Sequence, residues 1–233
     1  MILTSQGFRC CFKRISRVSL YSGKAQRQSS TNASAVYTGP ADPNDPSTST
    51  SPSDWTPDQR NILDVALRVD QAGEVAANWI YKGQMAVLGR DPVAGPLIQD
   101  MWDQEKKHLL VMDRLQAQHQ VRPTLLTGVA KLAGFGVGAM TALMGKEAAM
   151  ACTEAVETVI GEHYDDQLKE LDTLPTHPSI SLLKNVVREL RDDELEHLDI
   201  AVEHFSQRAP AHALLSTVIG GGCLMAIELC KRI

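Results

Sequence analysis

Two copies of one short stretch decide the fold of this chain: Asp103-Gln-Glu-Lys-Lys-His-Leu109 and Asp192-Asp-Glu-Leu-Glu-His-Leu198. Both read D-x-E-x-x-H-L, so each places a Glu three residues before a His. On an α-helix, residues three apart project from the same face, which brings a carboxylate and an imidazole close enough to hold one metal ion. A single Glu-x-x-His is weak evidence for a metal site. Two copies predict a repeated helix whose Glu and His residues bind metal.

A second repeated pattern, A-x-E-x(6)-Y-x(2)-Q, lies upstream of each copy. It begins at Ala72 and again at Ala155. The alignment pairs Glu74 with Glu157, Tyr81 with Tyr164, and Gln84 with Gln167. The chain therefore contains one pair of helices written twice.

Apolar residues recur at helical spacing in six stretches that Pro and Gly separate. We expect helices over residues 57–88, 96–118, 125–145, 145–171, 178–207 and 209–227. The third and the sixth are apolar almost all round, whereas carboxylates interrupt the apolar stripes of the other four. The predicted fold is all-α: a ferritin-like four-helix bundle with internal duplication plus two additional apolar helices, within a domain of residues 58–233.

Acidic side chains on a core stripe are costly to bury unless they are paired or bound to metal. One Glu from each of two helices and a Glu-x-x-His from each of the other two are the ligands of ferritin-like two-metal sites. Oxygen-rich ligation with one imidazole per metal favours iron or manganese. The predicted metal ligands are Glu74, Glu105, His108, Glu157, Glu194 and His197.

Other acidic residues compete for these roles. Glu154 and Glu162 are alternatives to Glu157, but only Glu157 is followed by the Tyr and Gln of the repeated pattern. Asp103 and Asp192 could accept hydrogen bonds from the ligand histidines, although their spacing points them partly away. The remaining acidic residues near the site are expected to be solvated or to lie outside the ligand shell: Glu154, Glu162, Glu189 and Glu196.

His163 precedes Tyr164 on the predicted fourth helix. The pair could relay electrons or protons to the metals, and His163 could also orient a ligand. The alternative is a simple role for His163 in the core or next to the ligands.

The charge is distributed unevenly. Residues 1–41 carry six basic residues and no acidic one, whereas the rest carries 17 basic against 28 acidic residues. A cationic, Ser-rich beginning predicts a mitochondrial transit peptide over residues 1–41, with a disordered basic tail as the alternative. Residues 42–57, rich in Pro, Ser, Thr and Asp, predict a flexible linker. The acidic remainder argues against a nucleic-acid partner.

The two apolar stretches allow two interpretations. Residues 132–145 are too short to span a bilayer, and Gly220–Gly222 interrupt the borderline second stretch. They could be core helices. We favour a surface that lies in the membrane interface or accepts an apolar ligand or partner, which also makes a homo-oligomer plausible.

From about residue 62 to the end, the chain resembles the mitochondrial demethoxyubiquinone hydroxylases of ubiquinone biosynthesis. Four blocks carry the resemblance: RVDQAGE at 68–74, MWDQEKKH at 101–108, GKEAAMACT at 145–153 and DDELEH at 192–197. It implies two iron ions per chain, with the family's iron ligands on the same six residues. It also implies a monooxygenase that uses dioxygen to hydroxylate the ring of a polyprenyl demethoxybenzoquinol, late in ubiquinone synthesis.

The resemblance implies a location and partners as well. The enzyme would attach peripherally to inner-membrane lipid on the matrix side of the mitochondrion. NADH or the quinol would supply electrons, and a lipid-binding protein within a multi-enzyme complex would be the partner.

Two functions of other classes remain open. A ferritin-type iron-handling protein or ferroxidase needs the same ligands but no apolar substrate surface. A metal-free helical scaffold of a membrane complex needs neither, and it would fold equally well after chelation.

Overall fold

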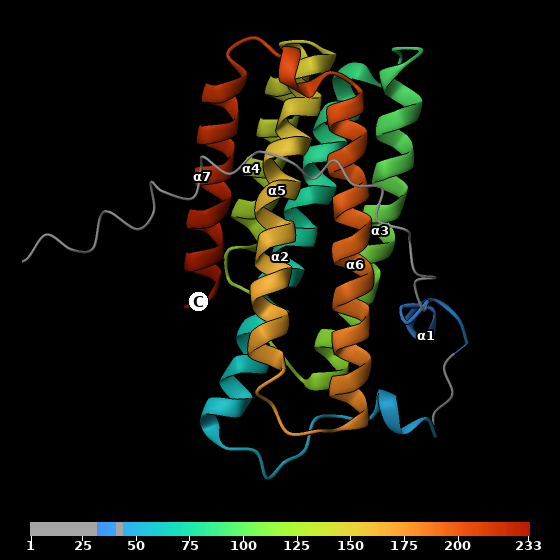
Figure 1. Cartoon of the computed structure of the whole chain (residues 1–233), viewed down its shortest axis with the longest axis vertical. Helices are drawn as coiled ribbons and strands as arrows, with labels where there is room; N and C mark the ends of the chain where they lie inside the picture. Colours follow the sequence, from blue (N-terminus) through green and yellow to red (C-terminus); the bar gives the residue numbers. More distant parts are fainter. Residues whose placement is uncertain (1–31, 41–43) are drawn as a thin grey trace, which may run out of the picture. The chain divides into compact units, whose positions relative to one another are not determined.

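The computed structural model describes residues 32–40 and 44–233, and every regular element in these ranges is a helix. Four long helices run side by side, as the prediction of a ferritin-like bundle requires (Figure 1). The long helices are α2 (Pro57–Leu88), α3 (Ala94–His119), α5 (Lys146–Leu171) and α6 (Pro178–Glu203); the others are α1 (Ala35–Thr38), η1 (Pro46–Thr48), α4 (Thr127–Leu143), η2 (Ser206–Arg208) and α7 (His212–Cys230).

Local sequence explains where the long helices begin. At the start of α2, the side chains of Thr56 and Gln59 each accept from the other's backbone N–H in a capping box. Pro178 opens α6, where the side chain of His177 accepts from the N–H of Ser179. Helix α6 ends earlier than the 178–207 expected, because Phe205 adopts a left-handed conformation (φ 66°).

The predicted metal ligands lie between two apolar clusters. The larger cluster includes Leu67 and Leu183, and the smaller includes Met101 and Met150. Along each of the four long helices, the predicted ligands come between residues of the larger cluster and residues of the smaller one. Apolar packing on both sides therefore holds the acidic positions away from solvent.

Helix α4 packs against α2 through glycines. A Cβ at Gly134 would lie 2.6 Å from the carbonyl oxygen of Ala76, and one at Gly138 would overlap the carbonyl oxygen of Ile80. Such close approach of backbones is typical of G-x-x-x-G helix pairs. The small residues let the two backbones approach closely, and Phe135 of α4 packs edge-on against Trp79 of α2.

Large apolar side chains of α4 and α7 are exposed. Leu132 is 78% exposed and Val218 63%. The alternative of two core helices is therefore wrong. By length and composition alone, α7 could cross a membrane. Of its most apolar stretch, 6% is buried inside the protein.

The polar segment before α2 differs from the flexible linker expected over residues 42–57. The side chain of Gln118 donates to the carbonyl oxygens of Ser47 and Ser49, and Arg60 donates to the Ser51 hydroxyl. Hydrogen bonds to α2 and α3 thus hold residues 47–51, although they offer little apolar surface. Upstream, Tyr37 is buried in the larger cluster and its hydroxyl donates to Gln118.

Candidate metal centre

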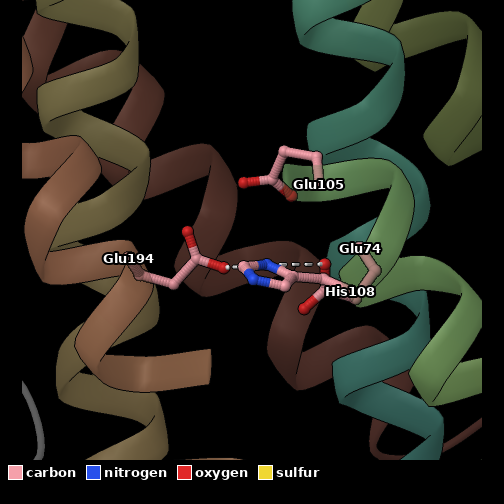
Figure 2. A group of neighbouring side chains, drawn as sticks. All are labelled: Glu74, Glu105, His108 and Glu194. Carbon is pink, nitrogen blue, oxygen red and sulfur yellow. Dashed lines mark hydrogen bonds and ion pairs between the residues drawn. The ribbon is translucent and has the colours of Figure 1, made fainter. Parts of the chain in front are cut away.

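The structure brings all six predicted ligands together in the middle of the bundle. Helix α2 supplies Glu74 and α5 supplies Glu157, while α3 and α6 each supply a Glu-His pair. Figure 2 shows Glu194 reaching from α6 towards His108, with Glu74 and Glu105 around the same space. The inward face predicted for each pair is therefore confirmed.

The six residues form two groups that share two carboxylates. One group is Glu74, Glu105, His108 and Glu194; the other is Glu105, Glu157, Glu194 and His197. Within each group, one possible ligand atom from every residue lies within 4.8 Å of the others. Glu105 and Glu194 belong to both groups, which is the arrangement that two neighbouring ions bridged by carboxylates require.

Both imidazoles turn the same nitrogen towards these shared carboxylates. Nδ1 of His108 lies 3.2 Å from Glu194 Oε1 and 3.9 Å from Glu74 Oε2. Nδ1 of His197 lies 3.2 Å from Glu105 Oε1 and 3.2 Å from Glu194 Oε2. Each histidine therefore offers Nδ1 to the centre.

The burial of these groups fits a bound metal pair. All six side chains are buried, and Oε2 of Glu105 and Oε2 of Glu74 have no hydrogen-bond partner among the described residues. Unpartnered buried carboxylate oxygens are costly unless a cation satisfies them. The donor set and its orphaned oxygens therefore fit two divalent ions.

Proton affinities follow from this crowding. Burial is the main cause that raises the pKa of Glu74, Glu105 and Glu157, and repulsion from neighbouring carboxylates adds to it. Burial acts against ionisation of Glu194 too, but hydrogen bonds from the two imidazoles lower its pKa. Although burial opposes it, contacts with Glu105 and Glu194 raise the pKa of His197 to about 11. The metal-free centre thus holds protons that bound metal would displace.

Two tyrosines hold the terminal carboxylates in place. The hydroxyl of Tyr164 donates to Glu74 Oε1 at 2.8 Å, and that of Tyr81 donates to Glu157 Oε1 at 3.3 Å. Each tyrosine thereby contacts the glutamate of the other copy of the repeated pattern.

Asp70 forms a further buried polar group beside Tyr164. It accepts from Gln167 Nε2 at 2.6 Å, and its other oxygen lies 3.2 Å from Nε2 of His163. The rings of His163 and Tyr164 are 6.1 Å apart between centroids. His163, which is partly exposed on α5, therefore lies beside Tyr164, and Tyr164 in turn contacts Glu74.

Glu154 and Glu189 lie outside both ligand groups, which is one of the two expected alternatives, and both are buried. His212 at the start of α7 lies 2.9 Å from Glu154, and both the N–H and the hydroxyl of Ser34 donate to Glu189. The partners come from distant segments, so helical spacing could not reveal them.

Asp103 and Asp192 do not contact the ligand histidines. Asp103 pairs with Lys106 and accepts from Gln99, and Asp192 accepts from Arg191. The sequence reasoning missed Asp193 instead, whose Oδ2 lies 3.1 Å from Nε2 of His108. Its position next to Glu194 in the Asp-Asp-Glu run was the only available signal.

Sequence reasoning also missed Asn78. Its side chain donates to the backbone carbonyls of Glu74 and Glu105, 3.1 and 2.7 Å away. It joins α2 to α3 at the level of the ligands. The position one turn after Glu74 could have indicated it.

Comparison with known proteins gives one family. The family model described as ubiquinone biosynthesis protein COQ7 matches residues 61–230. The NADPH-dependent 3-demethoxyubiquinone 3-hydroxylase of Bos taurus is 49% identical, covering 75% of this chain and 79% of the relative. The 5-demethoxyubiquinone hydroxylase of Saccharomyces cerevisiae is 44% identical over 75% and 80%. The 3-demethoxyubiquinol 3-hydroxylase of Rhodospirillum rubrum is 44% identical over 76% and 81%.

Proposed function

The chain belongs to the COQ7 family of ubiquinone biosynthesis proteins, and on this premise we propose that it hydroxylates the ring of a demethoxybenzoquinol at the six-residue centre. The observation that carries the proposal is the pair of ligand groups that share Glu105 and Glu194. A protein that only handled apolar molecules would have no reason to bury four carboxylates together.

The ligands of two iron ions are proposed as follows. Glu74 and His108 would serve one ion, Glu157 and His197 the other, and Glu105 with Glu194 both. A bound iron pair supplies the two-electron chemistry that inserts an oxygen atom from dioxygen into the ring. The choice of iron rests on the oxygen-rich donor set and on the family.

The protein's own residues prepare this centre. Tyr81 and Tyr164 fix the terminal carboxylates by hydrogen bonds. The two apolar clusters exclude water from the space between them, which strengthens the interactions of charged groups there. We further propose His163 and Tyr164 as a relay of protons or electrons, because Tyr164 donates to Glu74 and the ring of His163 lies beside that of Tyr164.

The reductant is proposed as a reduced nicotinamide nucleotide. Several relatives are named NADPH-dependent. The resemblance of the sequence leads us to expect NADH, and the quinol is a further candidate donor. Measuring the steady-state oxidation of NADPH and of NADH with a soluble quinone would distinguish the two nucleotides as electron donors.

The proposed location is the mitochondrion, because the Bos taurus and Saccharomyces cerevisiae relatives are named as mitochondrial. The transit peptide proposed within residues 1–41 would end before Ser34 and Tyr37, because both residues contact the folded domain. The exposed apolar side chains of α4 and α7 would attach the protein peripherally to the matrix side of the inner membrane and admit the polyprenyl substrate. The same surface would receive a lipid-binding partner of a multi-enzyme complex or a second copy of the chain.

Anaerobic titration with ferrous iron, followed by a quinol assay, tests the function. The full chain should retain two irons after gel filtration and convert a short-chain demethoxybenzoquinol to its hydroxylated product when dioxygen is admitted. Iron uptake with oxygen far beyond two ions would indicate a ferritin-type protein. A chain that binds no iron and melts at the same temperature after chelation would be the metal-free scaffold.

A further inference from the structure

The two histidines of the centre differ on the side that faces away from the shared carboxylates. Nε2 of His108 lies 3.1 Å from Oδ2 of Asp193. Nε2 of His197 is buried and has no hydrogen-bond partner among the described residues. The centre is therefore symmetric in its ligands and asymmetric behind them.

This difference determines how firmly each ring is held. Because Nδ1 of both rings faces the carboxylates, the remaining ring hydrogen belongs on Nε2 when a metal occupies Nδ1. The Nε2–H of His108 then donates to a carboxylate, which fixes the tautomer and orientation of the ring and makes it a stronger electron donor. The Nε2–H of His197 gains no such support.

The two copies of the repeat also differ at the matching sequence position. In the second copy, Asp193 directly precedes the ligand Glu194, whereas Gln104 precedes Glu105 in the first. An amide at this position has no negative charge with which to polarise an imidazole. Asp193 also remains partly exposed, with a third of its side chain accessible, so water continues to stabilise its charge.

We propose that Asp193 is a positioning residue that makes the two metal positions unequal. The position served by His108 binds a divalent ion more tightly, and therefore fills first, while the position served by His197 fills second. The inference rests on the proposed function only in that it requires the six residues to bind two ions. It adds an order of loading and a residue outside the ligand set that controls it.

The proposal is tested by anaerobic titration of the full chain with cobalt(II), followed by the visible absorption of the bound ion. The wild-type chain should bind two cobalt ions in two resolved steps. In Asp193→Asn, the tighter step should weaken by about 10- to 100-fold, the effect typical of losing a hydrogen-bonded carboxylate behind a metal-bound histidine. Its absorption band should shift, while the weaker step stays unchanged.

Asp192→Asn is the matched control. Asp192 neighbours Asp193, is exposed and pairs with Arg191, so this variant should titrate like the wild-type chain. Equal thermal unfolding of the metal-free variants would show that both fold. Two unchanged steps in Asp193→Asn, or equal weakening of both steps, would overturn the inference and leave the metal centre standing. No cobalt binding by the wild-type chain would overturn the metal centre itself.

Discussion

Tyr164 donates its hydroxyl hydrogen to Glu74 across 2.8 Å, and the two residues come from opposite copies of the repeated pattern. The same relation holds in reverse between Tyr81 and Glu157. The glutamines of the pattern also cross over: Gln167 donates to Asp70, and Gln84 to the carbonyl oxygen of Ala149. The Tyr and Gln residues that both copies of the pattern contain therefore make hydrogen bonds from one copy to the other.

Replacing Tyr164 by Phe should destabilise the metal-free protein by about 1–2 kcal/mol, because a buried carboxyl oxygen loses its donor. Tyr81→Phe should have a smaller effect, since its hydrogen bond is longer, at 3.3 Å. Urea unfolding of both variants with a chelator present measures the difference. An equal loss of unfolding free energy in both variants would show that the strength of these two hydrogen bonds does not follow their length.

Glu194→Gln should reduce bound iron from two ions per chain to one or none, because Glu194 belongs to both ligand groups. Hydroxylation should fall at least a hundredfold for the same reason. Iron analysis after gel filtration and product assay are the measurements. Asp199→Asn, an exposed position on the same helix, is the control and should match the wild-type chain. A Glu194→Gln chain with full iron and full activity would refute the assignment.

Gly138→Ala should destabilise the protein by about 1–3 kcal/mol or more, because the added methyl group overlaps the carbonyl oxygen of Ile80 and forces α4 away from α2. Gly136 lies on the same helix with no neighbouring atom within 4 Å of an added Cβ. Gly136→Ala should therefore be neutral or stabilising by up to about 1 kcal/mol. Thermal unfolding of the two variants in detergent tests this contrast.

Tyr37→Ala should cost about 3 kcal/mol of stability, because a large side chain leaves the apolar cluster next to α3. Tyr37→Phe removes only the hydrogen bond to Gln118 and should cost about 1 kcal/mol. Denaturant unfolding distinguishes them. If neither variant changed the midpoint, the segment before α2 would contribute nothing to the fold.

The buried side chain of His119 should make the protein sensitive to acid. Burial, with the nearby charges of Arg60 and His177, lowers its pKa from 6.5 to about 4. The unfolded chain therefore binds this proton first, so stability should fall as pH drops below about 6.5 and level off below about 4. Between pH 7.5 and 5.5 the loss is on the order of 1 kcal/mol.

His119→Gln separates this term from other titrations. The variant should lose about 1 kcal/mol less than the wild-type chain over that pH interval, whatever its stability at pH 7.5. Unfolding in urea at both pH values gives the two slopes. Parallel pH dependences would exclude His119 as a source of acid sensitivity.

The sequence was enough for the bundle and for placing the six candidate ligands on inward faces, because both depend on spacing along single helices. Glu105 with His108, and Glu194 with His197, share a face by helical geometry alone. Contacts between helices were out of reach. Asp193 meets His108 across the α3–α6 interface, and Glu189 meets Ser34 from a segment 155 positions away. Such partners depend on rotation and register between packed elements, which no periodicity within one helix encodes.

Because the tyrosine hydrogen bonds cross between the two copies, the duplicated chain resembles a dimer whose two subunits are joined covalently end to end. Residues 57–143 alone would leave Tyr81 without its acceptor and Glu74 without its donor, and residues 146–230 would lack the reciprocal pair. A covalent connection replaces an encounter between separate molecules by a high effective concentration of one half around the other. Because the halves can never exchange partners, a difference such as Asp193 can persist on one side only, which two identical subunits could not maintain.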